Sequence, residues 1–268
     1  MIEQKINHAQ IFKESFIDVT KEIQKPPIAL SIGEINLGQT RYDRAFGTFG
    51  NFSCITGASK SKKTFLKSAL VSGFIGGQST NYFNDFKTHR TKDMYILDFD
   101  TEQGEWHAQR TFKRVSKMVG SNYEYYKPFY LRQYDYKTRL EFIEWCIFES
   151  NYRDRIGLIV VDGFADLVKD VNDLEDSNNL VQKLLTWTDK SKAHLTGILH
   201  KNYGGEKPTG HLGSAILKKS ETVCTLDPSE YTLGHVRVRF THTRGFPIDD
   251  FEFYINEQGL PVKSDIII

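Results

Sequence analysis

The sequence has no long apolar run, few cysteines and almost no net charge. None of its apolar runs approaches the roughly 20 residues that cross a bilayer, and its first residues contain no apolar signal core. The three cysteines are scattered, which excludes a cysteine metal site and is typical of buried thiols in a reducing compartment. The formal net charge of +1 gives no global attraction to nucleic acid, so any such contact depends on local patches. We therefore expect a cytoplasmic protein with no membrane partner.

The chain has 268 residues, of which 39% are apolar and 26% are charged, as in ordinary globular proteins. This length allows one large domain or two small ones. Apolar positions within residues 1–25, before Pro26 and Pro27, predict one amphipathic helix that packs on its own core or on a neighbouring subunit. Packing on its own core is the more usual outcome. We expect an N-terminal helical extension at 1–30 and one main domain at 31–268.

A strand, a lysine-rich turn and a helix are predicted in this order between residues 52 and 74. The turn fits the pattern Gly-x-x-x-x-Gly-Lys-Thr, in which backbone amides and the start of a helix wrap a phosphate chain. Lys63 would reach the β- and γ-phosphates of ATP, and the Thr64 hydroxyl would hold Mg²⁺. The predicted nucleotide-binding residues are Gly57, Ala58, Ser59, Lys60, Ser61, Lys62, Lys63, Thr64 and Phe65.

The motif departs from its pattern at Lys62, which stands where the second glycine is usual. If the backbone there needs a positive φ, a lysine costs about 1 kcal/mol or more. The alternative interpretation is a lysine-rich surface turn before a helix.

Two predicted strands end in acidic residues. Asp162 follows an almost unbroken apolar run, typical of a strand buried in a parallel sheet, and stands where nucleotide hydrolases hold Mg²⁺. Glu102 follows the strand 94–99 and could polarise the water that attacks the γ-phosphate. The alternatives are an ordinary Asp-Gly turn at Asp162 and an acidic loop that caps the next helix through Asp100 or Thr101.

A fourth motif is the predicted strand 195–199, which ends in His200 and precedes a glycine-rich loop. If this strand lies beside the one that carries Asp162, the His200 donors can sense the γ-phosphate. The alternative is a structural histidine.

Strands alternate with helices from residue 52 to 200, which predicts an α/β fold with a mostly parallel central sheet flanked by helices. After Gly210 the chain is β-rich and is expected to extend the sheet at one edge with antiparallel strands. The other predicted elements are a loop at 78–93, helices at 106–118, 139–148 and 179–190, and strands at 129–133, 222–226, 235–242 and 250–255.

Together these motifs resemble the RecA-like P-loop ATPases, and the details are most similar to the RepA-type and KaiC-type branch. The mixture of motifs is closest to RepA-like ATPases of Bacteroidetes mobile elements, where a basic residue at the position of Lys62 is familiar. The resemblance covers about residues 35–260. It implies that Glu102 activates water, that His200 lies at a phosphate-sensing strand end, and that Arg244 is a basic finger for a neighbour's γ-phosphate. His242 stands where a second basic finger residue is usually a lysine.

The resemblance also implies a hexameric ring whose glycine-rich loops face a central channel and single-stranded DNA. The candidate DNA contacts combine basic groups with an aromatic for base stacking: Lys201, Asn202, Tyr203, Lys207 and His211. The alternative to DNA binding is that these residues belong to a surface loop with an ordinary charge balance. The sequence thus predicts an ATPase that uses MgATP, with a helicase or initiator role in replication of a mobile element. A KaiC-like regulatory ATPase that engages protein and an assembly module with little turnover remain alternatives.

Overall fold

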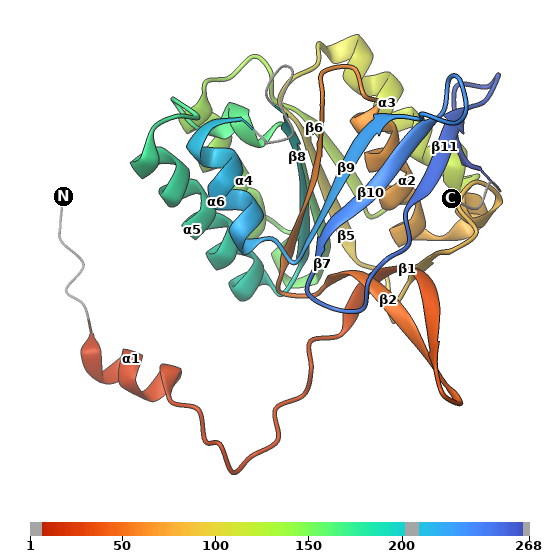
Figure 1. Cartoon of the computed structure of the whole chain (residues 1–268). Coiled ribbons are helices and arrows are strands. Elements are labelled where there is room, and N and C mark those ends of the chain that lie inside the picture. Colours follow the sequence, from red (N-terminus) through yellow and green to blue (C-terminus); the bar gives the residue numbers. More distant parts are fainter. Residues whose placement is uncertain (1–6, 202–208, 265–268) are drawn as a thin grey trace.

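A nine-stranded sheet runs through the centre of the computed structural model, which describes residues 7–201 and 209–264 (Figure 1). The strand order is β12-β11-β10-β9-β3-β8-β7-β5-β6. In chain order the strands are β3 (Phe52–Gly57), β5 (Tyr95–Asp100), β6 (Tyr126–Tyr130), β7 (Ile156–Asp162), β8 (His194–His200), β9 (Thr222–Pro228), β10 (Val236–Thr243), β11 (Phe251–Ile255) and β12 (Pro261–Lys263).

The six strands from β9 to β6 are parallel, whereas β10, β11 and β12 are antiparallel to their neighbours. Every residue of β3 and β7 is buried, because helices cover both faces of the sheet. The predicted fold class is therefore confirmed, including the antiparallel extension formed by the C-terminal strands.

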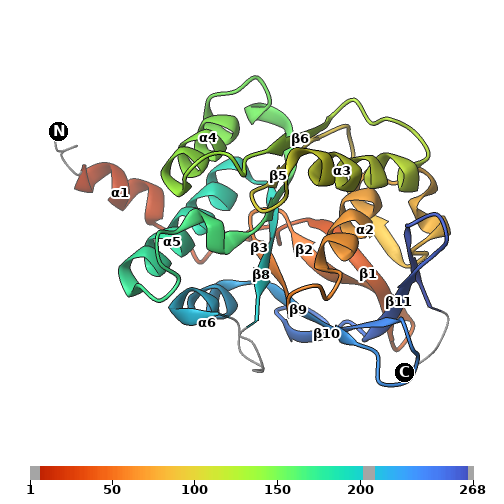
Figure 2. The same ribbon diagram turned by 90° about the horizontal axis from the view of Figure 1, so that it is seen from above.

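Helices cover the two faces of the sheet (Figure 2). On one face lie α2 (Lys63–Ile75) and α3 (Glu105–Val119), which pack on each other. On the other face lie α4 (Tyr136–Phe148), α5 (Leu174–Ser191) and α6 (Gly210–Lys219). Each face has its own apolar layer: Trp187 of α5 is fully buried in one, and Phe74 of α2 is fully buried in another. Among the described residues no helix is long and apolar enough to cross a membrane.

A smaller sheet of order β2-β1-β4 is made of β1 (Ile28–Leu37), β2 (Thr40–Thr48) and β4 (Phe86–Thr88), and its strands β1 and β2 lie below the main sheet in the view of Figure 1. Strand β4 and the short 3₁₀ helix η1 (Gly77–Asn81) lie in the segment 78–93 that was predicted to be a loop, so this prediction was only partly correct. Because β1 begins at Ile28, the small sheet starts within the segment assigned to the N-terminal extension.

Three other expectations about local structure were wrong. Helix α6 forms where a glycine-rich loop followed by β structure was expected, because Leu212 and Ile216, four residues apart, bury one helical face. Strand β6 lies three residues earlier than predicted. The long amphipathic helix at 1–25 is also incorrect: α1 spans only His8–Ser15 and buries no side chain.

Helix α1 and the extended segment after it project away from the body of the protein (Figure 1). The Asp18 side chain accepts hydrogen bonds from the amide and hydroxyl of Thr20, a local turn that competes with helix continuation. Phe12 and Val19 are 76% and 92% exposed, so the expected packing on the chain's own core does not occur.

Deleting residues 1–24 should therefore leave the fold intact. Because α1 buries nothing, we expect the free energy of unfolding to change by no more than about 0.5 kcal/mol, as for surface substitutions. Urea denaturation at low protein concentration measures this value. A loss of several kcal/mol would mean that the segment packs on the domain.

Candidate functional site

The four predicted motifs meet at the carboxyl edge of the parallel strands. Gly57 at the end of β3 is paired in register with His200 at the end of β8, and Asp162 at the end of β7 pairs with Asp100 at the end of β5. Strands β8 and β7 are themselves neighbours. The strand ends therefore lie side by side, at the edge where ligands bind in open α/β sheets.

A cleft of about 410 Å³ opens at this edge. It is lined by residues of the phosphate loop, the ends of β5, β7 and β8, and one face of α3: Ser59, Lys60, Ser61, Lys62, Lys63, Thr64, Phe65, Glu102, Gln103, Thr111, Arg114, Asp162, Ile198 and His200. Gly57 and Ala58 are not lining residues, although their carbonyl oxygens accept hydrogen bonds from Lys63. The structure thus brings the predicted nucleotide, metal and catalytic residues together, with the exception of Arg244.

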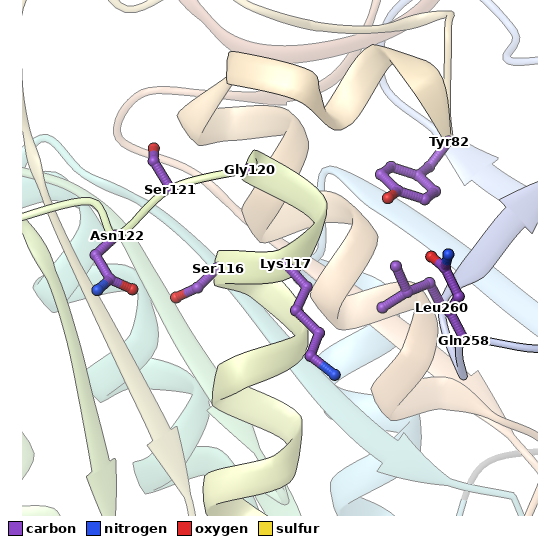
Figure 3. Close-up of a pocket in the computed structure, with 8 residues that line it drawn as sticks. All are labelled: Tyr82, Ser116, Lys117, Gly120, Ser121, Asn122, Gln258 and Leu260. Atoms are coloured by element: carbon purple, nitrogen blue, oxygen red, sulfur yellow. The ribbon is translucent and has the colours of Figure 1, made fainter.

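A larger pocket of about 780 Å³ lies elsewhere, between the end of α3 and the hairpin of β11 and β12 (Figure 3). Lys117 is the one charged side chain among its lining residues, which otherwise include Tyr82, Gln258 and Leu260. It contains none of the predicted motifs and no cluster of titratable groups, so the smaller cleft is the candidate site.

Lys63 begins α2, and its side chain folds back over the phosphate loop. Its Nζ donates hydrogen bonds to the carbonyl oxygens of Gly57 at 3.0 Å and Ala58 at 2.7 Å, and lies 3.1 Å from Nδ1 of His200. Burial lowers the pKa of Lys63, and the charges of Glu102 and Asp162 oppose this effect. The ammonium group is therefore held among weak partners that a phosphate oxygen could replace.

Lys62 adopts the left-handed conformation that its place in the motif suggested, with φ 64° and ψ 25°. Lys60 has the same φ of 64°, so two non-glycine residues of one short loop each carry a cost of about 1 kcal/mol or more. The Lys62 Nζ donates to the carbonyl oxygen of Gly234 at 3.1 Å, in the turn between β9 and β10. This contact joins the phosphate loop to the antiparallel part of the sheet.

Glu102 and His200 face each other across the cleft. His200 Nε2 lies 3.4 Å from Glu102 Oε2, and this hydrogen bond is the main cause of a lowered Glu102 pKa, against the opposing effect of burial. Glu102 is therefore a carboxylate at neutral pH. Because His200 also contacts Lys63, the three side chains form a chain of polar contacts from the phosphate loop to the end of β5.

The residues around Glu102 tie neighbouring strand ends together. Asp100 accepts hydrogen bonds from the amides of Glu102 and Gln103, whereas the N-cap of α3 is Gly104, so neither Asp100 nor Thr101 is the N-cap of this helix. Thr101 Oγ1 donates to the Asp162 carbonyl oxygen at 2.8 Å and lies 2.8 Å from a carboxylate oxygen of Asp166.

A buried charge network lies behind the cleft. Lys67 Nζ is 3.1 Å from Asp98 Oδ1 and 3.3 Å from Asp162 Oδ2, and the Lys67 side chain is fully buried. Tyr126 donates to the second oxygen of Asp98 at 2.6 Å. Burial raises the pKa of Asp162, whereas Lys67 lowers it. Lys67 therefore stabilises the ionised carboxylate at the end of β7.

The side chains of the cleft fit a Mg²⁺ ion that is shared with a nucleotide. Apart from its ion pair with Lys67, Asp162 Oδ2 has no hydrogen-bond partner among the described residues, and it lines the same cleft as Thr64. Within residues 7–201 and 209–264, no group of three or more His, Cys, Asp or Glu could hold a metal by itself. Mg²⁺ is usually bound by one or two carboxylates plus substrate phosphates, so this donor set needs the nucleotide.

The predicted DNA contacts are not gathered on one described surface. Lys201 is buried, its Nζ lies 3.1 Å from Asp227 Oδ1 and its amide donates to Gly57. That burial argues against direct contact of Lys201 with DNA. His211 is exposed on α6. Asn202, Tyr203 and Lys207 lie outside the described residues.

Arg244 lies at the opposite edge of the sheet from the phosphate loop. It follows β10, its amide donates to the Glu221 carbonyl oxygen, and its guanidinium lies 3.2 Å from Oδ1 of Asn51. Asn51 precedes β3, whereas the phosphate loop follows β3. Arg244 therefore cannot reach the cleft of its own chain.

In a comparison with known families, the profile of the AAA domain family matches residues 47–206. The chain belongs to this family. The matched part of the AAA domain contains the phosphate loop, Glu102, Asp162 and His200, and membership identifies the chain as a P-loop ATPase that binds ATP, typically with Mg²⁺. A search of curated proteins gave no match.

Sequence reasoning missed two cations of the AAA domain, Lys67 and Arg114. Lys67 follows Lys63 by four residues on a helix that is otherwise apolar, and a lysine on a buried helical face signals a buried acidic partner. Arg114 lies on α3 and lines the cleft together with Thr111 of the same helix. The sequence did not indicate which face of this helix would be turned toward the cleft.

Replacing Lys67 by methionine should destabilise the domain strongly, because two buried carboxylates lose their shared cation. We expect the free energy of unfolding to fall by about 3–5 kcal/mol, measured by urea denaturation. Without Lys67 the pKa of Asp162 in the folded state rises further, so the folded protein keeps a proton that the unfolded chain releases. Stability should therefore fall as pH rises, and the loss should be larger at pH 8 than at pH 5.

The matched control is Lys117→Met, an exposed lysine on α3, which should change the free energy of unfolding by less than about 0.5 kcal/mol. Equal stability of Lys67→Met and the wild-type protein would contradict the structural role of the network.

Proposed function

We propose that this AAA domain is a Mg²⁺-dependent ATPase of the RepA-type and KaiC-type RecA-like branch that works as a hexameric ring. Its role would be that of a replicative helicase or initiator of a mobile element, acting on single-stranded DNA. The observation that carries the ATPase part is the chain of contacts from Lys63 through His200 to Glu102, in the same cleft as Thr64 and Asp162.

Each side chain of the cleft has a role that its surroundings support. Lys63 would exchange the loop carbonyl oxygens for the β- and γ-phosphates, a stronger charge-assisted contact. Thr64 and Asp162 would hold Mg²⁺, which neutralises charge on the phosphates. Glu102 is ionised and partly exposed, so it can accept a proton from the attacking water. His200, which touches both Lys63 and Glu102, would respond to the γ-phosphate.

The position of Arg244 is the support for a ring. An arginine at the far edge of the sheet can complete phosphoryl transfer only in the cleft of a neighbouring copy, where a finger contributes 10³–10⁵ in rate in other ATPases and GTPases. The exposed apolar residues of α1 are compatible with a neighbour as well. We propose residues 1–30 as an N-terminal extension and 31–268 as the ATPase domain.

The burial of Lys201 favours a second candidate function, a KaiC-like regulatory ATPase that engages protein rather than DNA. The strained backbone at Lys60 and Lys62 is the feature that would favour the third candidate, an assembly module that binds nucleotide with little turnover. All three functions use the same cleft, so turnover and its response to DNA distinguish them.

A phosphate-release assay with and without single-stranded DNA tests the proposal. We expect turnover that requires Mg²⁺ and rises when DNA is added. Turnover without stimulation would support the regulator, and ATP binding without turnover the assembly module. Lys63→Ala should abolish ATP binding, because it removes the charge that meets the phosphates. The control Lys113→Ala, on the exposed face of α3, should bind and hydrolyse ATP normally.

Arg244→Ala should bind ATP as the wild-type protein does and lose turnover by at least about 10³-fold. The exposed Arg153→Ala serves as the control and should remain active. Mixing Arg244→Ala with Lys63→Ala subunits should restore part of the activity, because each mixed interface can contain one complete site. Normal turnover of Arg244→Ala, or no recovery in the mixture, would reject the finger.

A further inference from the structure

Arg114 is a partly buried cation in the wall of the ATP cleft. Its Nη1 donates to the Ser68 hydroxyl at 3.1 Å and lies 3.5 Å from the Thr64 carbonyl oxygen. Its guanidinium packs on the face of Phe65, with Cζ 3.7 Å from the ring centroid. These contacts fix the group between α3 and the first turns of α2, in a cleft that Thr64 and Asp162 also line.

The carboxylate of Asp162 acts on Arg114 without forming an ion pair: burial and the charge of Arg110 lower the Arg114 pKa to about 10, and the charge of Asp162 opposes this shift. No carboxylate in the described part of the chain forms an ion pair with it, whereas the partly buried Arg90, Arg139 and Arg237 each lie beside an aspartate. A charged group that is taken out of water is costly unless it is paired. A fixed, partly desolvated and unpaired guanidinium that faces a cleft therefore indicates that the cleft takes an anionic ligand.

The neighbouring arginine on the same helix is different. Arg110, one turn earlier, is exposed and lies over the ring of the exposed Trp106 at 4.8 Å. It does not line the cleft. The environment of Arg114 is therefore a property of its position and not of α3 as a whole.

We propose that Arg114 binds the terminal phosphate of ATP within its own subunit and makes the site prefer ATP to ADP. This proposal rests on the ATPase function above and adds a residue to it. Arg114 contacts the Thr64 carbonyl oxygen, and the charge of Asp162 acts on it. Thr64 and Asp162 are the residues expected to hold Mg²⁺ against the β- and γ-phosphates, and Glu102 lines the same cleft. A planar guanidinium held over the Phe65 ring presents its N–H groups to phosphate oxygens in fixed geometry.

The test is the affinity of Arg114→Gln for ATP and for ADP, each measured by calorimetry with Mg²⁺. A lost hydrogen bond to a charged group corresponds to about a tenfold to hundredfold weaker ATP binding. We expect ADP affinity to change less than threefold and the midpoint of thermal unfolding without nucleotide to stay the same or rise. Arg114→Lys should recover part of the ATP affinity. Arg110→Gln is the matched control and should bind both nucleotides normally.

Equal weakening of ATP and ADP in Arg114→Gln, or a lower stability without nucleotide, would assign Arg114 a structural role and overturn the proposal. Unchanged ATP affinity, or a wild-type protein that binds ADP as tightly as ATP, would also overturn it while leaving nucleotide binding established. A wild-type protein that binds neither nucleotide would reject the proposed function together with this inference.

Discussion

The ion pairs of Lys67 with Asp98 and Asp162 join the three elements on which the site is built. Lys67 belongs to α2, Asp98 to β5 and Asp162 to β7. Two buried carboxylates in one place repel each other unless a cation lies between them, so the position of α2 over the sheet is fixed by charge as well as by apolar packing. Lys63 is one helical turn earlier on the same helix, and this arrangement therefore also orients the phosphate loop relative to the end of β7.

The direction of the strands separates the residues of the chain's own cleft from Arg244. All parallel strands end at one edge, which collects Glu102, Asp162 and His200 from three strands without any long loop. Arg244 lies at the other edge because β10 runs antiparallel to β9. The antiparallel extension thus places a basic residue away from the cleft of its own chain, where a neighbouring copy would use it under the proposed function.

Much of this arrangement follows from the sequence. The apolar strands that end in Asp162 and His200, and the spacing from Gly57 to Thr64, predicted the strand ends and the loop, because apolar runs and loop patterns are local signals. Helix α6 was missed because its glycine-rich start indicated only a loop. The helix at residues 1–25 was overextended because apolar spacing alone does not reveal the turn at Asp18. The partners of Lys67 and the orientation of Arg114 could not be assigned from the sequence, because the residues around them are distant in the chain and become neighbours only when α2 and α3 pack on one face of the sheet.

Strand β10 connects the two edges of the sheet in a single element. Its first residues follow Gly234, whose carbonyl oxygen is held by Lys62 of the phosphate loop, and its last residue precedes Arg244. In a ring of the proposed kind, one stiff β-strand would thus span from a subunit's own nucleotide to the nucleotide of the next. A shift of β10 caused by nucleotide binding in one subunit would then move Arg244 relative to the nucleotide of the next subunit. Hydrolysis at successive sites of the ring could be coupled in this way through β10 alone.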